Sequence, residues 1–243
     1  MHADSEPLAA KSLRLPVRVN ASEKGSEQTT LHLFTAKLRD VKAFGMSPAS
    51  VLLCAAQLAA IAIAIPAEPQ YFEQLVDHFS ARQDTFQQRH YINATMFGGP
   101  GSPIFCIMGG EGQILPSTGI FYPPVVVMAS KLNALVIEPE HRFFGVSLPV
   151  SPYDTSALSL LTAEQALADA AAYITAMRKA YKCSGENGEP RCPVITVGGS
   201  YPGWLSAMMR LRYPEVVDMA YAGSAPMLFY SQLVDQAAYY KVS

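Results

Sequence analysis

Residues 198–203, Gly-Gly-Ser-Tyr-Pro-Gly, are the part of the chain best suited to chemistry. They follow an apolar run over residues 193–197 and open a helix-like segment over residues 204–212. A strand, a tight glycine turn with a serine at its apex and a helix form the layout of a nucleophile elbow. A serine hydroxyl is a poor nucleophile unless the backbone exposes it beside a base and an oxyanion hole. The segment therefore predicts a serine hydrolase whose nucleophile is Ser200.

The elbow departs from the usual G-x-S-x-G pattern, because Pro202 stands at the last glycine position and Gly203 follows one step later. Proline is tolerated there if Pro202 lies in the first helical turn. Its φ suits a helix, and its missing N–H would have had no intrahelical partner. The alternative is a glycine-rich loop that simply ends a strand, and the flanking elements must decide between the two.

The sequence around the elbow predicts alternating strands and helices. Strands are expected over residues 85–93, 103–108, 133–138, 194–197 and 217–222. Helices are expected over residues 122–131 and 163–181, the second with Thr162 and Gln165 placed as a capping box. This alternation implies a mostly parallel sheet with right-handed crossovers, an α/β architecture.

Two glycine turns, at residues 109–112 and 198–203, follow strands of this predicted sheet. Ligands of open α/β sheets bind at the carboxyl ends of the strands. Because both turns lie at such ends, Ser200 is predicted to be a site residue.

Composition bounds the remaining possibilities. The chain has 243 residues, half of them apolar, which is enough for one domain with a substantial core. A net charge of −2 gives no indication of nucleic acid as a partner, and no C-x-x-C or histidine-rich cluster suggests a metal or another cofactor. Cys183 and Cys192 flank a short polar loop and could close a disulfide in an oxidising compartment.

The N-terminus suggests export. Residues 1–45 are polar and aperiodic, and we expect a disordered extension that lies upstream of the true start. Residues 46–67 begin with Met46 and contain an apolar run that is short for a membrane span but suits a signal peptide. The alternative is a signal anchor that stays in the membrane. A cleaved signal predicts the secretory pathway, as a secreted or a lysosomal or vacuolar protein, and the sequon at Asn93 is a glycosylation candidate.

Several further motifs occur in one order between residues 70 and 226. They are Tyr71-Phe72 with Asp77-His78-Phe79, Thr85-Phe86-Gln87-Gln88-Arg89, Gly109-Gly110-Glu111-Gly112, Glu140-His141-Arg142-Phe143-Phe144-Gly145 with Ser147-Leu148-Pro149, Leu161–Asp169, the elbow, and Gly223-Ser224-Ala225-Pro226. With them the chain resembles the lysosomal and secreted serine exopeptidases that include prolyl carboxypeptidase, dipeptidyl peptidase II and thymus-specific serine protease.

The resemblance implies an α/β-hydrolase core over residues 68–226 and the start of a helical cap over residues 227–243. It also implies peptide substrates cleaved next to proline by an acyl-enzyme mechanism, no cofactor, and a possible homodimer. It leaves carboxypeptidase and dipeptidyl-peptidase action equally open.

The same resemblance implies roles for individual residues. Ser200 would be the nucleophile, and the backbone N–H groups of Tyr201 and Gly110 would form the oxyanion hole. Glu111 would either contact substrate or hold its own loop.

Two histidines could be mistaken for the catalytic base. His141 precedes Ser200, whereas the order in this fold is Ser, Asp, His, so we expect a structural, hydrogen-bonded histidine. Asp77 and His78 are adjacent in the chain and cannot easily be aligned as a dyad, so we expect a turn or strand-edge signature there.

The triad partners of Ser200 are not found in the sequence. No histidine follows Ser200 in the sequence. Two aspartates follow it: Asp218 falls at the start of an expected strand, and Asp235 falls in the expected cap. We therefore expect that the chain as given does not assemble a Ser-His-Asp triad by itself. Either it is a truncated version of a longer peptidase, or it is a real short product that is inactive or needs a second chain. A lipase or esterase, and a non-catalytic secreted protein on the same scaffold, are the alternative functions.

Overall fold

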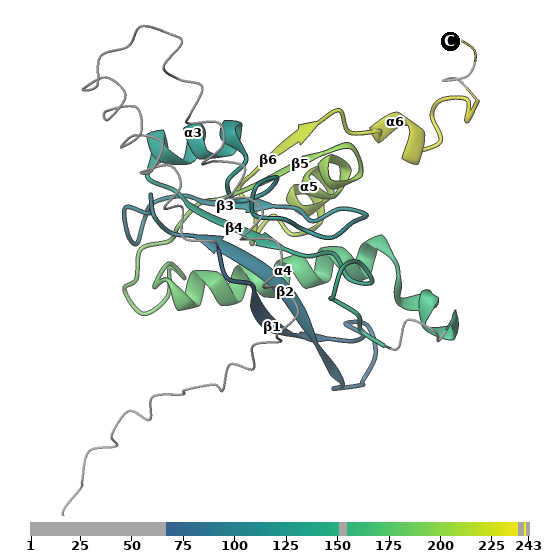
Figure 1. Ribbon diagram of the computed structural model, residues 1–243, viewed down its shortest axis with the longest axis horizontal. Coiled ribbons are helices and arrows are strands. Elements are labelled where there is room, and N and C mark those ends of the chain that lie inside the picture. Colours follow the sequence, from purple (N-terminus) through teal and green to yellow (C-terminus); the bar gives the residue numbers. More distant parts are fainter. Residues whose placement is uncertain (1–66, 151–154, 238–240, 242–243) are drawn as a thin grey trace, which may run out of the picture. The chain divides into compact units, whose positions relative to one another are not determined.

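The computed structural model describes residues 67–150, 155–237 and 241, and within them a six-stranded sheet forms the centre (Figure 1). The strands lie in the order β1-β2-β4-β3-β5-β6. Their bounds are β1 Gln70–Leu75, β2 Thr85–Asn93, β3 Ile104–Ile107, β4 Leu135–Pro139, β5 Val194–Gly199 and β6 Met219–Gly223. The helices are α3 Pro123–Leu132, α4 Ala163–Ala180, α5 Ser200–Arg212 and the short α6 Met227–Tyr230, with the 3-10 turn η2 Thr155–Leu160 before α4.

The sheet is parallel from β4 through β3 and β5 to β6, as predicted, but its other end is antiparallel. β2 runs antiparallel to both β4 and β1. The sequence analysis expected no strand at β1. Within the described part of the chain this edge strand has a neighbour on one side only, and it buries little of itself, so its sequence, QYFEQL, lacks the apolar run of a central strand.

The two faces of the sheet carry separate cores. Alternate residues of the central strands point to opposite faces, as the strand period requires. One face packs against α4 and α5 around Ile104, Ile137 and Leu205. The other face packs against α3 around Phe105 and Val136. The helices thus lie on both faces, α3 on one and α4 on the other (Figure 1), which is the α/β-hydrolase arrangement that the sequence predicts.

The start of α4 follows the prediction only in part. Thr162 Oγ1 accepts a hydrogen bond from the Gln165 backbone N–H at 3.2 Å, which is the first half of a capping box. The second half does not form, because the Gln165 side chain donates to Asp77 Oδ1 and accepts from the His78 N–H at 3.0 Å. A tertiary contact has replaced the local one, and it ties the end of β1 to α4.

The helix expected from residue 227 onward is short. α6 covers Met227–Tyr230, and none of its side chains is buried. The predicted extension over residues 1–45, Cys54 and all but the last residue of the predicted signal peptide lie outside the described residues. Among the described helices, none is long and apolar enough to cross a membrane.

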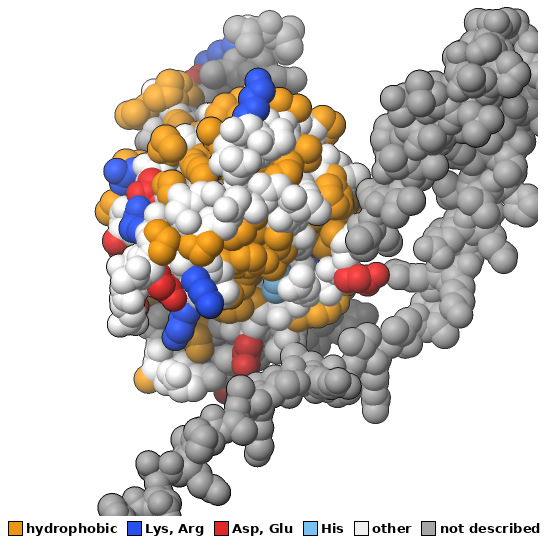
Figure 2. Space-filling model, turned by 90° about the vertical axis from the view of Figure 1, so that its left-hand side faces the viewer, with side chains coloured by type: hydrophobic (Ala, Val, Ile, Leu, Met, Phe, Trp, Pro, Cys, Tyr) orange, Lys and Arg blue, Asp and Glu red, His pale blue; other side chains and the backbone are white. Residues whose placement is uncertain are grey.

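One face of the molecule carries a patch of hydrophobic side chains with charged side chains around it (Figure 2).

Candidate active site

Ser200 lies at the junction of β5 and α5 in a backbone conformation that serine seldom adopts. Its φ is +57°, in the left-handed region, and the preceding Gly199 is extended with φ −123° and ψ 149°. The side chain of Ser200 is exposed. Non-glycine residues held in this conformation are strained and concentrate at functional sites. The strand passes directly into the helix, so the segment is an elbow and not a loop that merely ends a strand.

Glycines make the elbow tight. A Cβ on Gly198 would lie 2.2 Å from the carbonyl oxygen of Pro202, so no larger residue fits where the strand meets the helix. A Cβ on Gly203 would lie 2.8 Å from the carbonyl oxygen of Gly223 on β6. Pro202 lies in the first turn of α5, where its missing N–H costs no intrahelical bond. The glycine that appears one position late in the sequence is therefore the one that lets α5 approach β6.

The turn after β3 lies against the elbow. A Cβ on Gly110 would lie 2.7 Å from Cγ of Pro202, and a Cβ on Gly109 would lie 2.5 Å from the carbonyl oxygen of Pro139. The segments that carry Gly110 and Tyr201, the predicted oxyanion donors, are thus neighbours. Their roles as donors remain predictions.

Both ring nitrogens of His141 have hydrogen-bond partners. Its Nδ1 lies 2.7 Å from the carbonyl oxygen of Arg142, and its Nε2 lies 3.0 Å from the hydroxyl of Tyr201. A carbonyl oxygen can only accept, so Nδ1 carries the proton and the Tyr201 hydroxyl donates to Nε2. Burial lowers the pKa of His141, which favours the neutral ring that this pairing requires. His141 is a hydrogen-bonded residue that holds the Tyr201 side chain.

Tyr201 also belongs to a group of aromatic side chains beside the elbow. Its ring stacks on Trp204 with centroids 6.2 Å apart, and Tyr230 of α6 meets both rings edge-on. Burial raises the pKa of Tyr201 to about 12, so the phenol stays protonated and can donate to His141. These contacts fix the side chain of the residue that follows Ser200.

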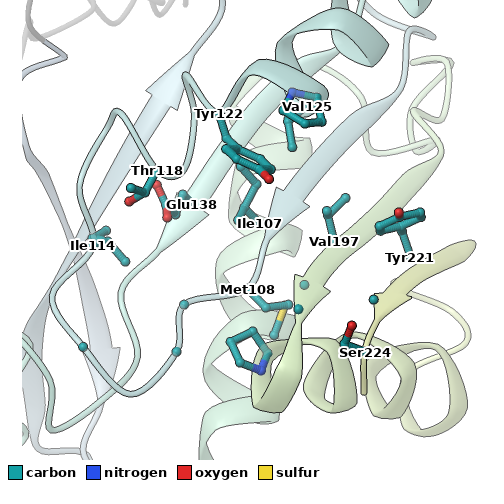
Figure 3. Close-up of a pocket in the computed structure, with 18 of the residues that line it drawn as sticks. Ile107, Met108, Ile114, Thr118, Tyr122, Val125, Glu138, Val197, Tyr221 and Ser224 are labelled. Atoms are coloured by element: carbon teal, nitrogen blue, oxygen red, sulfur yellow. The ribbon is translucent and has the colours of Figure 1, made fainter. Parts of the chain in front are cut away.

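A cavity of about 640 Å³ opens between the elbow, the turn at residues 109–114 and α3. Its lining is mainly apolar, and Glu111 and Glu138 are the carboxylates in it. Figure 3 shows Glu138 beside Thr118 at one end and Ser224 and Tyr221 toward the other. Glu138 is 5% exposed, and its Oε2 has no hydrogen-bond partner among the described residues. Burial raises the pKa of Glu138 to about 8. The sequence analysis did not single out this residue, because it stands within an apolar strand.

The Asp77-His78 pair supports the fold. His78 Nε2 contacts Asp169 Oδ1 at 2.8 Å, while Asp77 accepts from the Phe79 N–H at 2.9 Å and from Gln165. Asp169 also accepts from two nitrogens of the fully buried Arg142, at 2.6 and 2.7 Å. Motifs that lie far apart in the sequence thus meet in one buried network at the start of α4.

The two aspartates that follow Ser200 form ion pairs away from the elbow. Asp218 pairs with Arg178 and Arg191 and accepts from the Val194 N–H at 2.8 Å, at the start of β5 and therefore away from the elbow. Asp235 is exposed and pairs with Lys241. Neither arrangement is that of a triad carboxylate.

The cysteine and sequon predictions have different outcomes. Cys183 and Cys192 are joined in a disulfide between the end of α4 and β5. The glycosylation of Asn93 stays a prediction. Its side chain is buried at the end of β2, donates to the Ile120 carbonyl at 3.3 Å and accepts from Thr95. The described residues contain no group of three or more His, Cys, Asp or Glu side chains that could hold a metal.

Comparison with known proteins identifies the family of this chain. Residues 74–243 match the family model described as serine carboxypeptidase S28. The lysosomal Pro-X carboxypeptidase of Mus musculus is 40% identical over 164 residues, which are 65% of this chain and 32% of that protein. The thymus-specific serine protease of Mus musculus is 37% identical over 173 residues, 71% of this chain and 32% of that protein.

Among solved structures, the Pyrococcus furiosus esterase Pf2001 superposes with a TM-score of 0.43 at 14% identity, covering 67% of this chain and 53% of that one. The chain spans about a third of the length of the curated relatives that it matches. With its family model covering most of the sequence, the chain belongs to the serine carboxypeptidase S28 family of serine peptidases.

Proposed function

We propose that this chain carries the nucleophile of a serine exopeptidase that cleaves peptide bonds next to proline. The observation that supports the proposal best is the exposed Ser200, held at φ +57° between β5 and α5. The proline preference rests on the relatives, one of which is named a Pro-X carboxypeptidase.

In the proposed reaction, Ser200 Oγ attacks the carbonyl carbon of the scissile bond and its proton goes to a base. The N–H groups of Tyr201 and Gly110 would stabilise the oxyanion, helped by the N-terminus of α5. The leaving amine takes the proton, and an ester on Ser200 remains. Water then attacks the ester, which releases the product acid and restores the serine.

We propose that the base and its carboxylate come from outside the described residues. His78 contacts Asp169, and His141 contacts the Arg142 carbonyl and Tyr201. His90 is buried within the fold against Tyr173, and burial lowers its pKa to about 4. Each described histidine therefore has a structural position, and a Ser-His-Asp mechanism needs another imidazole.

The location that fits this proposal is the lysosome or another part of the secretory pathway. The lysosomal relatives support it, and a disulfide between Cys183 and Cys192 is stable only in an oxidising compartment.

A fluorophosphonate probe tests the proposal. On the 243-residue chain we expect slow labelling at most, because none of the described histidines is free to activate Ser200. On a version extended toward the length of the relatives, we expect rapid labelling that Ser200→Ala abolishes. Rapid labelling of the extended version at another residue would refute Ser200 as nucleophile. Rapid labelling of the short chain would refute the need for an external base.

A further inference from the structure

The cavity beside the elbow has an unusual charge for a peptide site. Two acidic side chains line it, and both are carboxylates, Glu111 and Glu138. None of the described residues that line it is Lys, Arg or His. A peptide's terminal carboxylate would meet only like charge here, whereas a protonated amine would meet opposite charge.

Of the two carboxylates, Glu138 is the better candidate to bind an amine. Glu111 is exposed and its charge is screened by water, but Glu138 is 5% exposed and its Oε2 has no hydrogen-bond partner among the described residues. A buried carboxylate oxygen without a hydrogen-bond partner is costly, and it persists where something outside the static fold compensates it. An amine that entered the cavity would supply both a charge and a donor.

The surroundings of Glu138 leave it available to a ligand. Its positive neighbour Arg89 is paired with Glu140 and is therefore already compensated. The backbone of Ile120 gives Glu138 a hydrogen bond, and Gly119 lies so close that a Cβ there would overlap the carboxylate. The ionisable groups that interact electrostatically with Glu138 are Arg89, Tyr91, Cys106, Glu140 and Tyr173. Burial raises the pKa values of the two tyrosines and the cysteine, so these stay neutral near pH 7.

We propose that Glu138 binds a protonated primary amine of the ligand in this cavity, and that the amine is the free amino terminus of a peptide. The inference rests on the proposed function in taking the cavity as the substrate site. It then favours dipeptidyl-peptidase action over carboxypeptidase action, because the site would hold the amino end of the substrate.

Proton release upon binding is the most direct test. Burial raises the pKa of Glu138 to about 8, so at pH 6.5 the free protein holds a proton there that a bound ammonium would expel. The probes are alanyl-proline amide, its N-acetylated form, and N-acetyl-lysyl-proline amide. Titration calorimetry in two buffers of different ionisation enthalpy gives the proton count for each.

We expect alanyl-proline amide to release close to one proton per molecule bound, and its apparent Kd to fall by up to about tenfold per pH unit between pH 5.5 and 7.5. The N-acetylated form should bind at least about tenfold more weakly at pH 7.5. Glu138→Gln should abolish the proton release and the difference between the two compounds. Glu186→Gln, which removes an exposed carboxylate elsewhere, should change neither.

Equal binding of the free and acetylated compounds would overturn the proposal. Tighter binding of the lysyl compound would overturn the assignment to the amino terminus. The comparison of the free and acetylated compounds requires only the unsubstituted chain, so it decides the matter even if Glu138→Gln does not fold. These are equilibrium measurements that Ser200→Ala should leave unchanged, so their failure is distinct from a failure of Ser200 labelling.

Discussion

Single residues decide whether the elbow can form, because the backbone passes close to itself there. Ser200 accepts a left-handed backbone, while Gly198, Gly203 and Gly110 supply close approaches that a side chain would block. Gly199 lies between them yet has open space around it, since a Cβ there would meet nothing nearer than the Gly223 carbonyl at 3.9 Å. Adjacent glycines in the motif thus have different physical roles.

The contrast between the two glycines gives a prediction. Gly198→Ala should lower the free energy of unfolding by about 2 kcal/mol or more, because its methyl group would overlap the carbonyl of Pro202. Gly199→Ala, the matched control, should change it by less than about 1 kcal/mol. Urea denaturation followed by fluorescence measures both, and equal effects of the two substitutions would argue against this packing.

Glu138 gives a second prediction, in the pH dependence of stability. Its pKa is raised to about 8 in the fold by burial, so the folded state holds a proton that the unfolded state loses above its ordinary pKa of 4.5. Its contribution to stability is complete below pH 4.5 and is lost as the pH rises to 8, at up to about 1.4 kcal/mol per pH unit.

Comparison with Glu138→Gln isolates this effect. His90, whose pKa is lowered to about 4, contributes in the opposite direction between pH 4 and 6.5, and that contribution cancels in the difference between the two proteins. We expect the stability of the unsubstituted chain relative to Glu138→Gln to decline from pH 5 to pH 8. A difference that stays constant over this range would show that Glu138 is ionised in the fold.

At the scale of elements, polar contacts position the site as much as apolar packing does. Asp169 on α4 holds Arg142 from the loop after β4 and His78 from the segment after β1. His141, next to Arg142, then holds Tyr201 on α5. A chain of contacts therefore runs from the edge of the sheet to the residue beside Ser200.

This network predicts the effect of removing its central carboxylate. Asp169→Asn should destabilise the fold by about 3–5 kcal/mol, because it leaves the guanidinium of Arg142 buried without its counter-charge. Asp84→Asn removes an equally well-formed pair with Arg82, but both partners are exposed, so the cost should stay below about 1 kcal/mol. Chemical denaturation of both variants tests the contrast, and similar losses would mean that burial does not set the strength of these pairs.

At the scale of the whole molecule, β6 is an edge strand with apolar side chains in water. Met219 is 56% exposed and Tyr221 60%, and among the described residues β6 has a partner strand only on its β5 side. The exposed Leu228, Phe229 and Leu233 follow shortly after it. Unprotected edges of this kind pair with other strands or with a second molecule.

We therefore expect the 243-residue chain to self-associate in a concentration-dependent way. Met219→Lys should weaken the association, because a charged side chain on an edge opposes strand pairing. Leu132→Lys, which places the same charge on a similarly exposed apolar position at the end of α3, should not. Sedimentation velocity over a range of concentrations measures this, and a monomer at every concentration would contradict the prediction.

The sequence by itself determined the elements and the family. Helix capping at Thr162, the run of apolar residues in β4 and β5, and the glycine turns are local signals, so the alternation of strands and helices and the position of Ser200 could be predicted from them. The β1 strand could not, because an edge strand needs few apolar residues.

Only the tertiary structure decided which polar residues meet. The contacts of Asp169 with His78, and of His141 with Tyr201, join residues 91 and 60 positions apart, and no spacing rule connects them. The same holds for the burial of Asn93 and for that of Glu138, which turns an ordinary carboxylate into a candidate binding group. Burial is a property of the packed chain, because it depends on neighbours that the local sequence does not contain.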